Sequence, residues 1–533
     1  MPSDRVASPC SSVRLARPLG VWLAAALILL PVLAEAQALP GLSSLRVAYN
    51  TRKATANPQG ELKAQLDAVD KAIVAATRAG DIGEARRQLA RGMALLAGDA
   101  WTPALDYRNS LVIRSERTIV DSSEPYAARL EQIYKPEIDL TPALSARVSL
   151  LRRAGAKPGA ARPAAPPPME TVREFGRLDG VARDLRESPF AMELDLAAVP
   201  DGVYTLEAEL FDGDTSLGAA RLGLVLHKGL DERLRALEAG AAAAPEAVRA
   251  DIRYAGDFIR NVNRGRVGRG TFDTAMELRA AEAVLAAVKK REDPYRGRTG
   301  SMERHYLLEG AGEVMPYRVH VPAAYRAAAP APLVIALHGL GGNEDAFFDA
   351  YDGAAVRLAE QHGFLLAAPL GYRVDGFYGA GMGGAPDAAT RRRLDLSEKD
   401  VLEVVRRMRD DYNVDARRIY LIGHSMGAIG TWHLAAKYPD LWAAVGPFSG
   451  TGSPASVASM KGIPQIVVHG DADPTVNVSG SRNMVAEMKR LGVPVTYIEV
   501  PGGNHSDVVV PNMPKVFEFL AGQRKEAAVP SVK

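Results

Sequence analysis

In residues 301–525, short apolar runs alternate with stretches that have helical spacing. The helical patterns lie near 350–361 and 401–412, and the apolar runs cover 333–337, 364–368, 419–422, 443–445, 463–468 and 495–500. Short, nearly uninterrupted apolar strands separated by helices predict a mostly parallel sheet with helices on both faces. The sequence therefore predicts an α/β domain over 301–525, a length that one hydrophobic core can support.

Ser425 lies at the centre of Gly-His-Ser-Met-Gly, residues 423–427, between an apolar run and a helical pattern. This strand–turn–helix setting is typical of a nucleophile elbow, in which a sharp turn exposes the serine hydroxyl. We expect Gly423 and Gly427 to be small because strand and helix approach closely there. The alternative is a serine in an ordinary tight turn.

A serine hydroxyl needs a base, and the base needs a carboxylate that orients it. In this setting the expected chain order is serine, then acid, then histidine. Asp473 follows the apolar run 463–468, and His505 follows the run 495–500 in a glycine-containing loop. The other eight histidines precede the serine or lie in the elbow, at strand ends or on a predicted helix. We predict His505 as the base and Asp473 as the acid, with Asp471 as the alternative acid.

The segment His-Gly-Leu-Gly-Gly, residues 338–342, follows the predicted strand 333–337. An oxyanion needs two fixed N–H donors, one from the residue after the nucleophile and one from this loop. These positions predict the amides of Met426 and Leu340 as the donors. A plain loop or a phosphate-binding loop is the alternative, but the glycines lack a following Lys-Ser/Thr and dinucleotide spacing.

Residues 332–345 and 418–433 resemble a group of α/β-hydrolases. The group includes secreted polyhydroxybutyrate-depolymerase-like and feruloyl-esterase-like enzymes, phospholipase/carboxylesterase relatives and predicted peptidases. The resemblance covers about 301–525, and it implies the α/β-hydrolase fold and its triad without implying a substrate. Ala428 departs from the pattern, because many relatives have a third glycine there.

Residues 371–393 form a predicted loop that is longer than most and contains the aromatic residues Tyr372, Phe377 and Tyr378. These rings either contact the substrate or anchor the loop onto the domain. The run Arg391 to Arg393 could meet an anionic substrate, but such runs are usually solvated surfaces.

The first 300 residues divide into regions that differ in composition and in the spacing of their apolar residues. Residues 37–165 are predicted to be helical, with a helical hairpin over 60–98 and an Ala/Gly/Pro-rich linker over 153–168. Residues 166–228 alternate in polarity, which predicts a β-sandwich-like module, and residues 229–300 return to helix. The chain is therefore expected to have an α+β N-terminal region before the α/β domain, with a flexible tail over 526–533.

Residues 1–36 have the pattern of a cleavable export signal: three arginines, an apolar run of about 15 residues and Ala-Glu-Ala before Gln37. A membrane anchor is the alternative, although that run is shorter than a bilayer requires. The one cysteine, Cys10, lies within this segment. We expect an exported protein, periplasmic or extracellular, with no disulfide and no stable membrane insertion.

Taken together, these features predict a serine hydrolase that cleaves carboxylic esters, on small molecules or on polymers, through an acyl-enzyme intermediate. A prolyl-oligopeptidase-like peptidase is one alternative, since the same triad cleaves amides. A second alternative is that the N-terminal region binds a polysaccharide or envelope partner and the hydrolase domain is secondary. The net charge of +2 gives no reason to expect nucleic acid, and the sequence contains no cofactor or metal motif.

Overall fold

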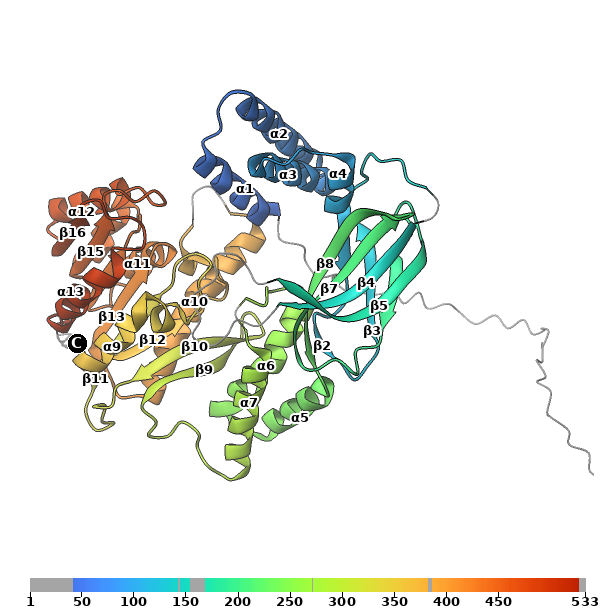
Figure 1. Ribbon diagram of the computed structural model, residues 1–533. Helices are drawn as coiled ribbons and strands as arrows, with labels where there is room; N and C mark the ends of the chain where they lie inside the picture. The colour runs from blue at the N-terminus through green and yellow to red at the C-terminus, as the bar shows by residue number, and fades with distance from the viewer. Residues whose placement is uncertain (1–41, 142–143, 154–167, 271, 382–385, 527–533) are drawn as a thin grey trace, which may run out of the picture.

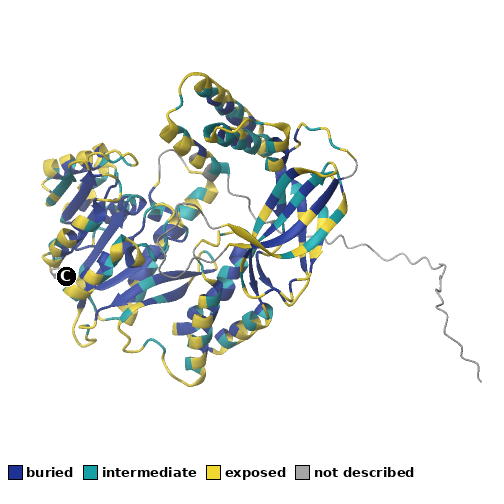
Figure 2. Ribbon diagram, in the orientation of Figure 1, coloured by how far each residue is buried: buried dark blue, intermediate teal, exposed yellow. Residues whose placement is uncertain are grey.

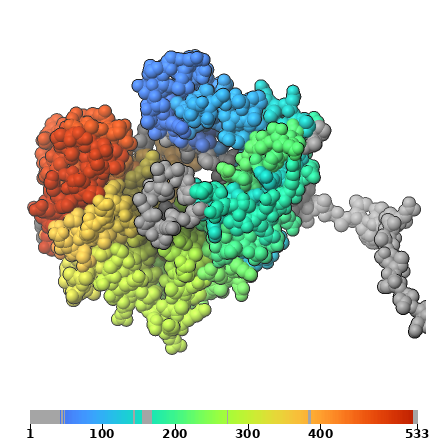
Figure 3. Space-filling model, viewed as in Figure 1, coloured from blue at the N-terminus to red at the C-terminus, as the bar shows by residue number. Residues whose placement is uncertain are grey.

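The computed structural model of the chain describes residues 42–141, 144–153, 168–270, 272–381 and 386–526. The chain passes from N-terminal helices through a β-sandwich and a second group of helices to a large α/β domain (Figure 1). In the space-filling view, the N-terminal helices and the sandwich form lobes beside the α/β domain (Figure 3). The predicted export signal and residues 527–533 of the predicted tail lie outside the described ranges. Within these ranges, no helix is long and apolar enough to cross a bilayer.

The α/β domain is built on an eight-stranded sheet in the spatial order β16-β15-β14-β13-β11-β12-β10-β9. Its strands are β9 (Gly300–Leu308), β10 (Glu313–Val321), β11 (Ala331–Leu337), β12 (Leu365–Pro369), β13 (Val414–His424), β14 (Ala444–Phe448), β15 (Gln465–Gly470) and β16 (Val495–Val500). Strands β11 to β16 pair in parallel, whereas β9 and β10 form an antiparallel edge. The predicted mostly parallel sheet is confirmed.

Helices cover both faces of this sheet, and the central strand β11 is therefore buried on both sides. Leu333 and Ile335 pack into one hydrophobic core with helices α10, α11 and α12, and Val334 packs into another with α9 and α13. The helices are α8 (Ala346–Asp349), α9 (Ala354–His362), α10 (Ala388–Asp411), α11 (Met426–Lys437), α12 (Ser479–Leu491) and α13 (Val509–Ala521). Figure 2 shows the buried strands between helices whose outer faces are exposed. The carboxyl ends of the parallel strands are therefore the place where loops can gather functional side chains.

The β-sandwich consists of a three-stranded sheet, β1-β3-β6, and a five-stranded sheet, β2-β8-β7-β4-β5, around one shared hydrophobic core. Its strands are β1 (Leu111–Arg114), β2 (Ile119–Asp121), β3 (Tyr126–Gln132), β4 (Leu144–Arg153), β5 (Met169–Val181), β6 (Phe190–Leu194), β7 (Gly202–Asp212) and β8 (Thr215–His227). The alternation seen in the sequence belongs to β7 and β8, whose buried residues line this core.

The prediction that residues 37–165 are helical is wrong after α4 (Pro103–Ser110), because β1 to β4 occupy 111–153. In β3, buried Tyr126, Ala128 and Leu130 alternate with more exposed residues, which is the burial pattern of a strand. The predicted linker also has a different place in the fold. Arg153 of β4 pairs with Met169 of β5, so this segment connects two strands of one sheet, and its residues 154–167 lie outside the described ranges.

The N-terminal helices are α1 (Leu42–Ala56), α2 (Gly60–Ala79) and α3 (Ile82–Ala97). Helices α2 and α3 form the hairpin that the sequence predicts, and the Asp81 side chain accepts a hydrogen bond from the Glu84 amide at the start of α3. Leu66, Ile73 and Leu89 belong to a small core of these helices. The hairpin therefore has its own apolar contacts, separate from the core of the sandwich.

The second helical group is α5 (Leu230–Ala243), α6 (Glu246–Asn263) and α7 (Thr274–Lys289), and it lies between the sandwich and the α/β domain (Figure 1). At one end of α6, the Asn263 side chain hydrogen-bonds the backbone of Ile119 in β2. Elsewhere on α6, Asp251 accepts from the His305 amide of β9 and Asp257 accepts from the Val314 amide of β10. Helix α6 therefore joins the sandwich to the antiparallel edge of the hydrolase sheet.

Candidate active site

Ser425 occupies the turn between β13 and α11 with φ 58° and ψ −115°. A non-glycine residue rarely adopts this backbone conformation, and it persists only where neighbours hold it. The Ser425 amide donates to the Phe448 carbonyl of β14 (2.9 Å), and the Ser425 carbonyl accepts from the amides of Ala428 and Ile429 in α11. Strand and helix together hold the serine in its strained position.

The two elbow glycines lie where strand and helix come closest. A Cβ atom at Gly423 would collide with the Gly427 carbonyl, and one at Gly427 would collide with the Leu337 carbonyl of β11. Both collisions are with backbone, which cannot move aside as a flexible side chain can. Any larger residue at either position would therefore force the turn away from the sheet.

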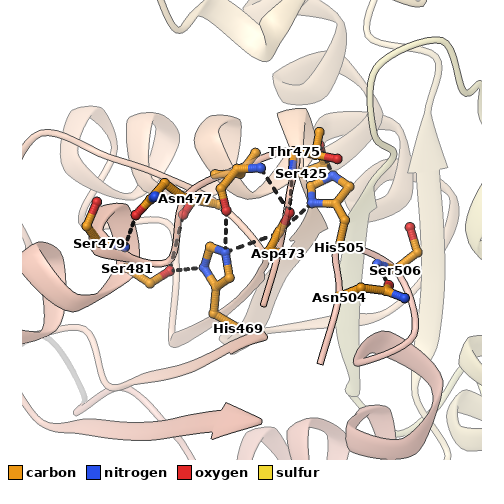
Figure 4. Close-up of polar contacts among 12 residues, drawn as sticks. Ser425, His469, Asp473, Thr475, Asn477, Ser479, Ser481, Asn504, His505 and Ser506 are labelled. Atoms are coloured by element: carbon orange, nitrogen blue, oxygen red, sulfur yellow. Dashed lines mark hydrogen bonds and ion pairs between the residues drawn. The ribbon is translucent and has the colours of Figure 1, made fainter. Parts of the chain in front are cut away.

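Ser425, His505 and Asp473 form one chain of hydrogen bonds at the carboxyl ends of the strands (Figure 4). His505 Nε2 lies 2.8 Å from Ser425 Oγ, and His505 Nδ1 lies 2.7 Å from Asp473 Oδ2. Asp473 follows β15, and His505 lies in the loop between β16 and α13. The three residues predicted from the sequence are brought together with the spacing that base catalysis by a histidine requires.

The Asp473 carboxylate is fully buried and is held from several sides. Its Oδ1 accepts from the amides of Thr475 (2.7 Å) and Val476 (3.0 Å), while Oδ2 faces His505. Burial alone would raise the pKa of Asp473, but the hydrogen bond from His505 and those two amides outweigh burial and lower this pKa. The carboxylate therefore stays ionised beside the imidazole.

Asp471, the alternative acid, has a different partner. Its Oδ1 accepts from the Gly502 amide at 2.6 Å, which ties the loop after β15 to the loop after β16. Asp471 thus stabilises the loop that carries His505, while Asp473 contacts the imidazole directly.

Two further histidines surround these residues, and sequence reasoning assigned neither of them a role. His469, fully buried at the end of β15, lies 2.7 Å from Ser481 Oγ and donates from Nε2 to the Val476 carbonyl, 3.0 Å away. The same Nε2 lies 3.2 Å from Asp473 Oδ2, as Figure 4 shows. The only signal in the sequence was its position at the end of a predicted strand.

His424 lies next to the nucleophile and accepts at Nδ1 from the Tyr351 hydroxyl, 2.8 Å away. Its Nε2 donates to the His505 carbonyl at 2.9 Å and so fixes the backbone of the base. Burial lowers the pKa of His424 to about 4, and a buried neutral imidazole suits one donated and one accepted hydrogen bond.

The predicted oxyanion donors, the amides of Leu340 and Met426, lie on the two segments that meet at the nucleophile. A Cβ atom at Gly339 would lie 3.4 Å from the Ser425 Cβ, so the 338–342 loop passes close to the serine. Among the described residues, neither the Leu340 nor the Met426 amide donates to another protein group, whereas the Gly341 amide donates to the Val374 carbonyl (2.8 Å). Two unengaged amides thus lie beside Ser425.

The aromatic residues proposed as substrate contacts have other roles. Tyr378 is completely buried, and its hydroxyl donates to the His338 carbonyl at 3.1 Å. Tyr372 is 8% exposed, and its amide donates to Asp400 Oδ2 at 2.6 Å. Phe377 is partly buried against the same core. Of the two interpretations of these rings, burial of Tyr378 and Tyr372 in the core supports anchoring of the loop.

By contrast, two apolar side chains in the neighbouring loops are exposed. Leu340 is 60% exposed and Val374 is 45% exposed, and the hydrogen bond between Gly341 and Val374 keeps their loops together. The loop is also shorter than predicted. Helix α10 begins at Ala388, so the arginines 391–393 lie in its first turns, where Arg393 pairs with Asp375 at 2.8 Å.

Residues 309–524 match the model of a protein family described as "Putative esterase". This segment is an esterase-like α/β-hydrolase. It contains Ser425, Asp473 and His505, together with both loops that carry the unengaged amides. The resemblance inferred from residues 332–345 and 418–433 is confirmed.

Curated relatives of this segment include several esterases. A bifunctional acetylxylan esterase/xylanase of Neocallimastix patriciarum is 28% identical over 169 residues, which are 32% of this chain and 22% of the relative. Feruloyl esterase B of Talaromyces funiculosus is 28% identical over 142 residues, which are 27% of this chain and 38% of the relative. The chain thus spans less than half the length of these relatives.

A solved ferulic acid esterase of Anaeromyces mucronatus, in complex with ferulic acid, is also similar. Its sequence identity is 18% and its TM-score 0.35, over 44% of this chain and 94% of that one.

Proposed function

We propose that this protein hydrolyses carboxylic esters through Ser425, His505 and Asp473. The hydrogen-bond chain from Ser425 Oγ through the imidazole of His505 to the buried Asp473 carboxylate carries this proposal. A serine hydroxyl is a weak nucleophile unless a base takes its proton, and a histidine works as that base when a carboxylate fixes its orientation. The match of residues 309–524 to an esterase family supports the ester as the bond that is cleaved.

In the proposed reaction, Ser425 Oγ attacks the ester carbonyl carbon while its proton moves to His505 Nε2. The amides of Leu340 and Met426 donate to the oxygen that becomes negative. His505 then gives the proton to the departing alcohol oxygen as the bond from carbon to that oxygen breaks, which leaves an acyl group on Ser425. A water molecule, deprotonated by His505, attacks this acyl group and releases the acid and the free serine.

Within ester hydrolysis, we infer a substrate with an apolar acyl or aryl group attached to a sugar or polysaccharide. The exposed side chains of Leu340 and Val374 support the apolar part, because their loops are joined by a hydrogen bond and the loop with Leu340 passes close to Ser425. The relatives named for acetylxylan and feruloyl esters support the carbohydrate part.

The test is the variant Ser425→Ala with Ser506→Ala as its matched control, because Ser506 is exposed and adjoins His505. We expect Ser425→Ala to lose p-nitrophenyl acetate and butyrate hydrolysis and covalent labelling by a fluorophosphonate, with unchanged circular dichroism. Ser506→Ala should retain both. Labelling of a folded Ser425→Ala protein would contradict the proposal.

Acetylated xylan, methyl ferulate and a panel of short peptide amides then separate the substrate classes. Turnover of the esters without turnover of the amides supports the proposal. Faster cleavage of the amides would instead identify a peptidase that uses the same three residues.

We further infer that the enzyme acts after export, on the strength of the signal-like pattern in residues 1–36. Amino-terminal sequencing of the protein purified from a secreting host is expected to begin at Gln37. Recovery of the full chain in the cytosol would contradict this inference.

A further inference from the structure

A second group of ionisable side chains lies where α7 meets the edge strand β9. Glu277 of α7 and Glu303 and His305 of β9 each place one possible metal-ligating atom within 4.8 Å of the others. Glu277 and His305 are buried and Glu303 is half-buried. Gathering two carboxyl groups and an imidazole away from water is costly unless something compensates their charges.

His305 is oriented within this group by Asp251 of α6. The His305 amide and its Nδ1 both lie within hydrogen-bond distance of Asp251 Oδ1, at 2.9 Å and 3.0 Å. Its Nε2 faces Glu303 Oε1 at 3.2 Å, and its ring stacks on Tyr254 with a centroid distance of 3.9 Å. Metal-binding histidines commonly have this arrangement, in which one ring nitrogen is held by a carboxylate and the other is turned toward the ion.

Glu344 supplies an independent observation. It is 6% exposed, and its Oε2 is buried without a hydrogen-bond partner among the described residues. The register of β9 and β10 pairs Glu303 with Arg318, and Arg318 donates to Oδ1 of Asp345, the residue after Glu344. Glu344 therefore lies near the same group. An unpartnered buried carboxyl oxygen is an unfavourable arrangement that a bound cation would satisfy.

We propose that Glu277, Glu303 and His305 bind one divalent cation, with the unpartnered carboxyl of Glu344 near them. Two carboxylates and one imidazole suit an ion that accepts both oxygen and nitrogen ligands, such as Zn²⁺ or Mn²⁺. The sequence predicted no metal because it contains no ligand motif at short spacing. These ligands come from two separate segments, α7 and β9, so only the fold brings them together.

The cation would also attract the carboxyl of Glu344, which follows the 338–342 loop by two residues. This attraction would limit the movement of the loop that carries the Leu340 amide. The effect on catalysis rests on the proposed function, whereas the binding of the cation does not. Chelation is therefore expected to lower kcat for p-nitrophenyl esters while KM changes little.

The experiment uses the full-length protein purified without added metal, measured first for metal content by inductively coupled plasma mass spectrometry. After treatment with dipicolinate, ZnCl₂, MnCl₂, CaCl₂ and MgCl₂ are each titrated while thermal unfolding is followed. We expect ZnCl₂ or MnCl₂ to raise Tm by about 5 °C at saturation, with one ion bound per chain. Absence of any cation-dependent rise in Tm would overturn the proposal.

The variants Glu277→Gln and Glu303→Gln separate a bound cation from a cluster neutralised by protons. If a cation binds, each variant loses the cation-dependent rise in Tm. If protons alone compensate the charges, Glu277→Gln replaces a carboxyl group that is already neutral, so Tm changes little and no cation affects it. The control Glu309→Gln changes the same charge at an exposed position just after β9 and should keep the full response. A full response in both cluster variants would also overturn the proposal.

Tm and metal content do not depend on ester hydrolysis. Loss of the cation response in a protein that still hydrolyses esters would count against the cation site alone. Conversely, a cation-stabilised protein without esterase activity would count against the proposed function alone.

Discussion

The two halves of the candidate active site differ in how completely their polar groups are engaged. On one side, Asp473, His505 and His469 hydrogen-bond one another or the backbone at 2.7 to 3.2 Å. On the other side, the amides of Leu340 and Met426 donate to no other protein group among the described residues, and the Leu340 side chain is mostly exposed. The proposed acid–base half has its hydrogen bonds complete within the protein, whereas the proposed oxyanion half keeps two amides without a protein acceptor among the described residues.

The two halves are therefore expected to have different tasks, proton transfer in the acid–base half and contact with the substrate in the oxyanion half. Groups that move a proton need a fixed geometry before the substrate arrives, and buried hydrogen bonds supply it. Groups that stabilise a developing charge must leave their donors free for the oxygen that will accept them. Changes in the acid–base half are therefore expected to lower kcat strongly, and changes at the outer rim of the oxyanion half to alter KM modestly.

The largest effect is expected from Asp473→Asn. Loss of this carboxylate removes the charge that stabilises a protonated His505, so kcat/KM for p-nitrophenyl acetate should fall by about 10⁴-fold. Asp471→Asn is the matched control, since the Asp471 carboxylate hydrogen-bonds only the Gly502 amide of the neighbouring loop among the described residues. Asp471→Asn should lower kcat/KM by less than tenfold. The reverse order of these two effects, in steady-state kinetics, would make Asp471 the acid.

His424 gives the second prediction, because its buried imidazole couples stability to pH. Burial lowers the pKa of folded His424 to about 4 from an ordinary value of 6.5. Between these two pH values the unfolded protein binds a proton at His424 that the folded protein does not, so acid favours unfolding. The contribution of His424 to the free energy of unfolding should fall by up to about 3 kcal/mol as pH drops from 6.5 to 4.

Urea unfolding of the wild type and of His424→Gln at several pH values isolates this contribution as a difference. The difference between the two proteins should shrink toward acid pH. A difference that is constant over this range would mean that His424 is not held neutral by its surroundings.

Val374→Ser tests the outer rim of the oxyanion half. Val374 is 45% exposed beside the loop that carries Leu340, so replacing it removes apolar contact area that only a bound substrate would cover. KM for p-nitrophenyl butyrate should rise by about fivefold, with little change in kcat, since a valine-sized contact contributes about 1 kcal/mol when half buried. Leu307→Ser, an exposed apolar position on β9, is the control and should leave KM unchanged. A fivefold fall in kcat in Val374→Ser would mean that Val374 supports the acid–base half.

The sequence could predict the residues of the acid–base half better than those of the oxyanion half, for a physical reason. Strand periods and chain order determine where the carboxyl ends of parallel strands meet, so Ser425 and His505 could be predicted and the acid narrowed to Asp473 or Asp471. The role of His469 could not be predicted, because its contact with Asp473 depends on the path of one short loop.

The sequence left Tyr372 and Tyr378 between substrate contact and anchoring, because aromatic rings in a long loop can do either. The sequence does not reveal that Gly371 and Gly430 leave room for the Tyr378 ring inside the core. The sandwich was placed too late in the chain for a similar reason, since β1 to β3 are short and the partners that bury them are distant in sequence.

The smallest effect is expected from Tyr378→Phe, which decides between anchoring and substrate contact. The variant keeps the buried ring and removes only the hydroxyl that donates to the His338 carbonyl at 3.1 Å. Because His338 begins the loop with the Leu340 amide, loss of this bond should lower the stability of the α/β domain by about 1 kcal/mol. We expect a fall in Tm of about 2–4 °C and unchanged KM for p-nitrophenyl butyrate. Tyr372→Phe loses two hydrogen bonds, one donated to Glu313 at 3.4 Å and one accepted from Arg373 at 3.2 Å. Both are longer than the Tyr378 bond, and the fall in Tm should be smaller. A raised KM with an unchanged Tm in Tyr378→Phe would mean that the hydroxyl reaches the substrate, and the loop would then belong to the recognition surface.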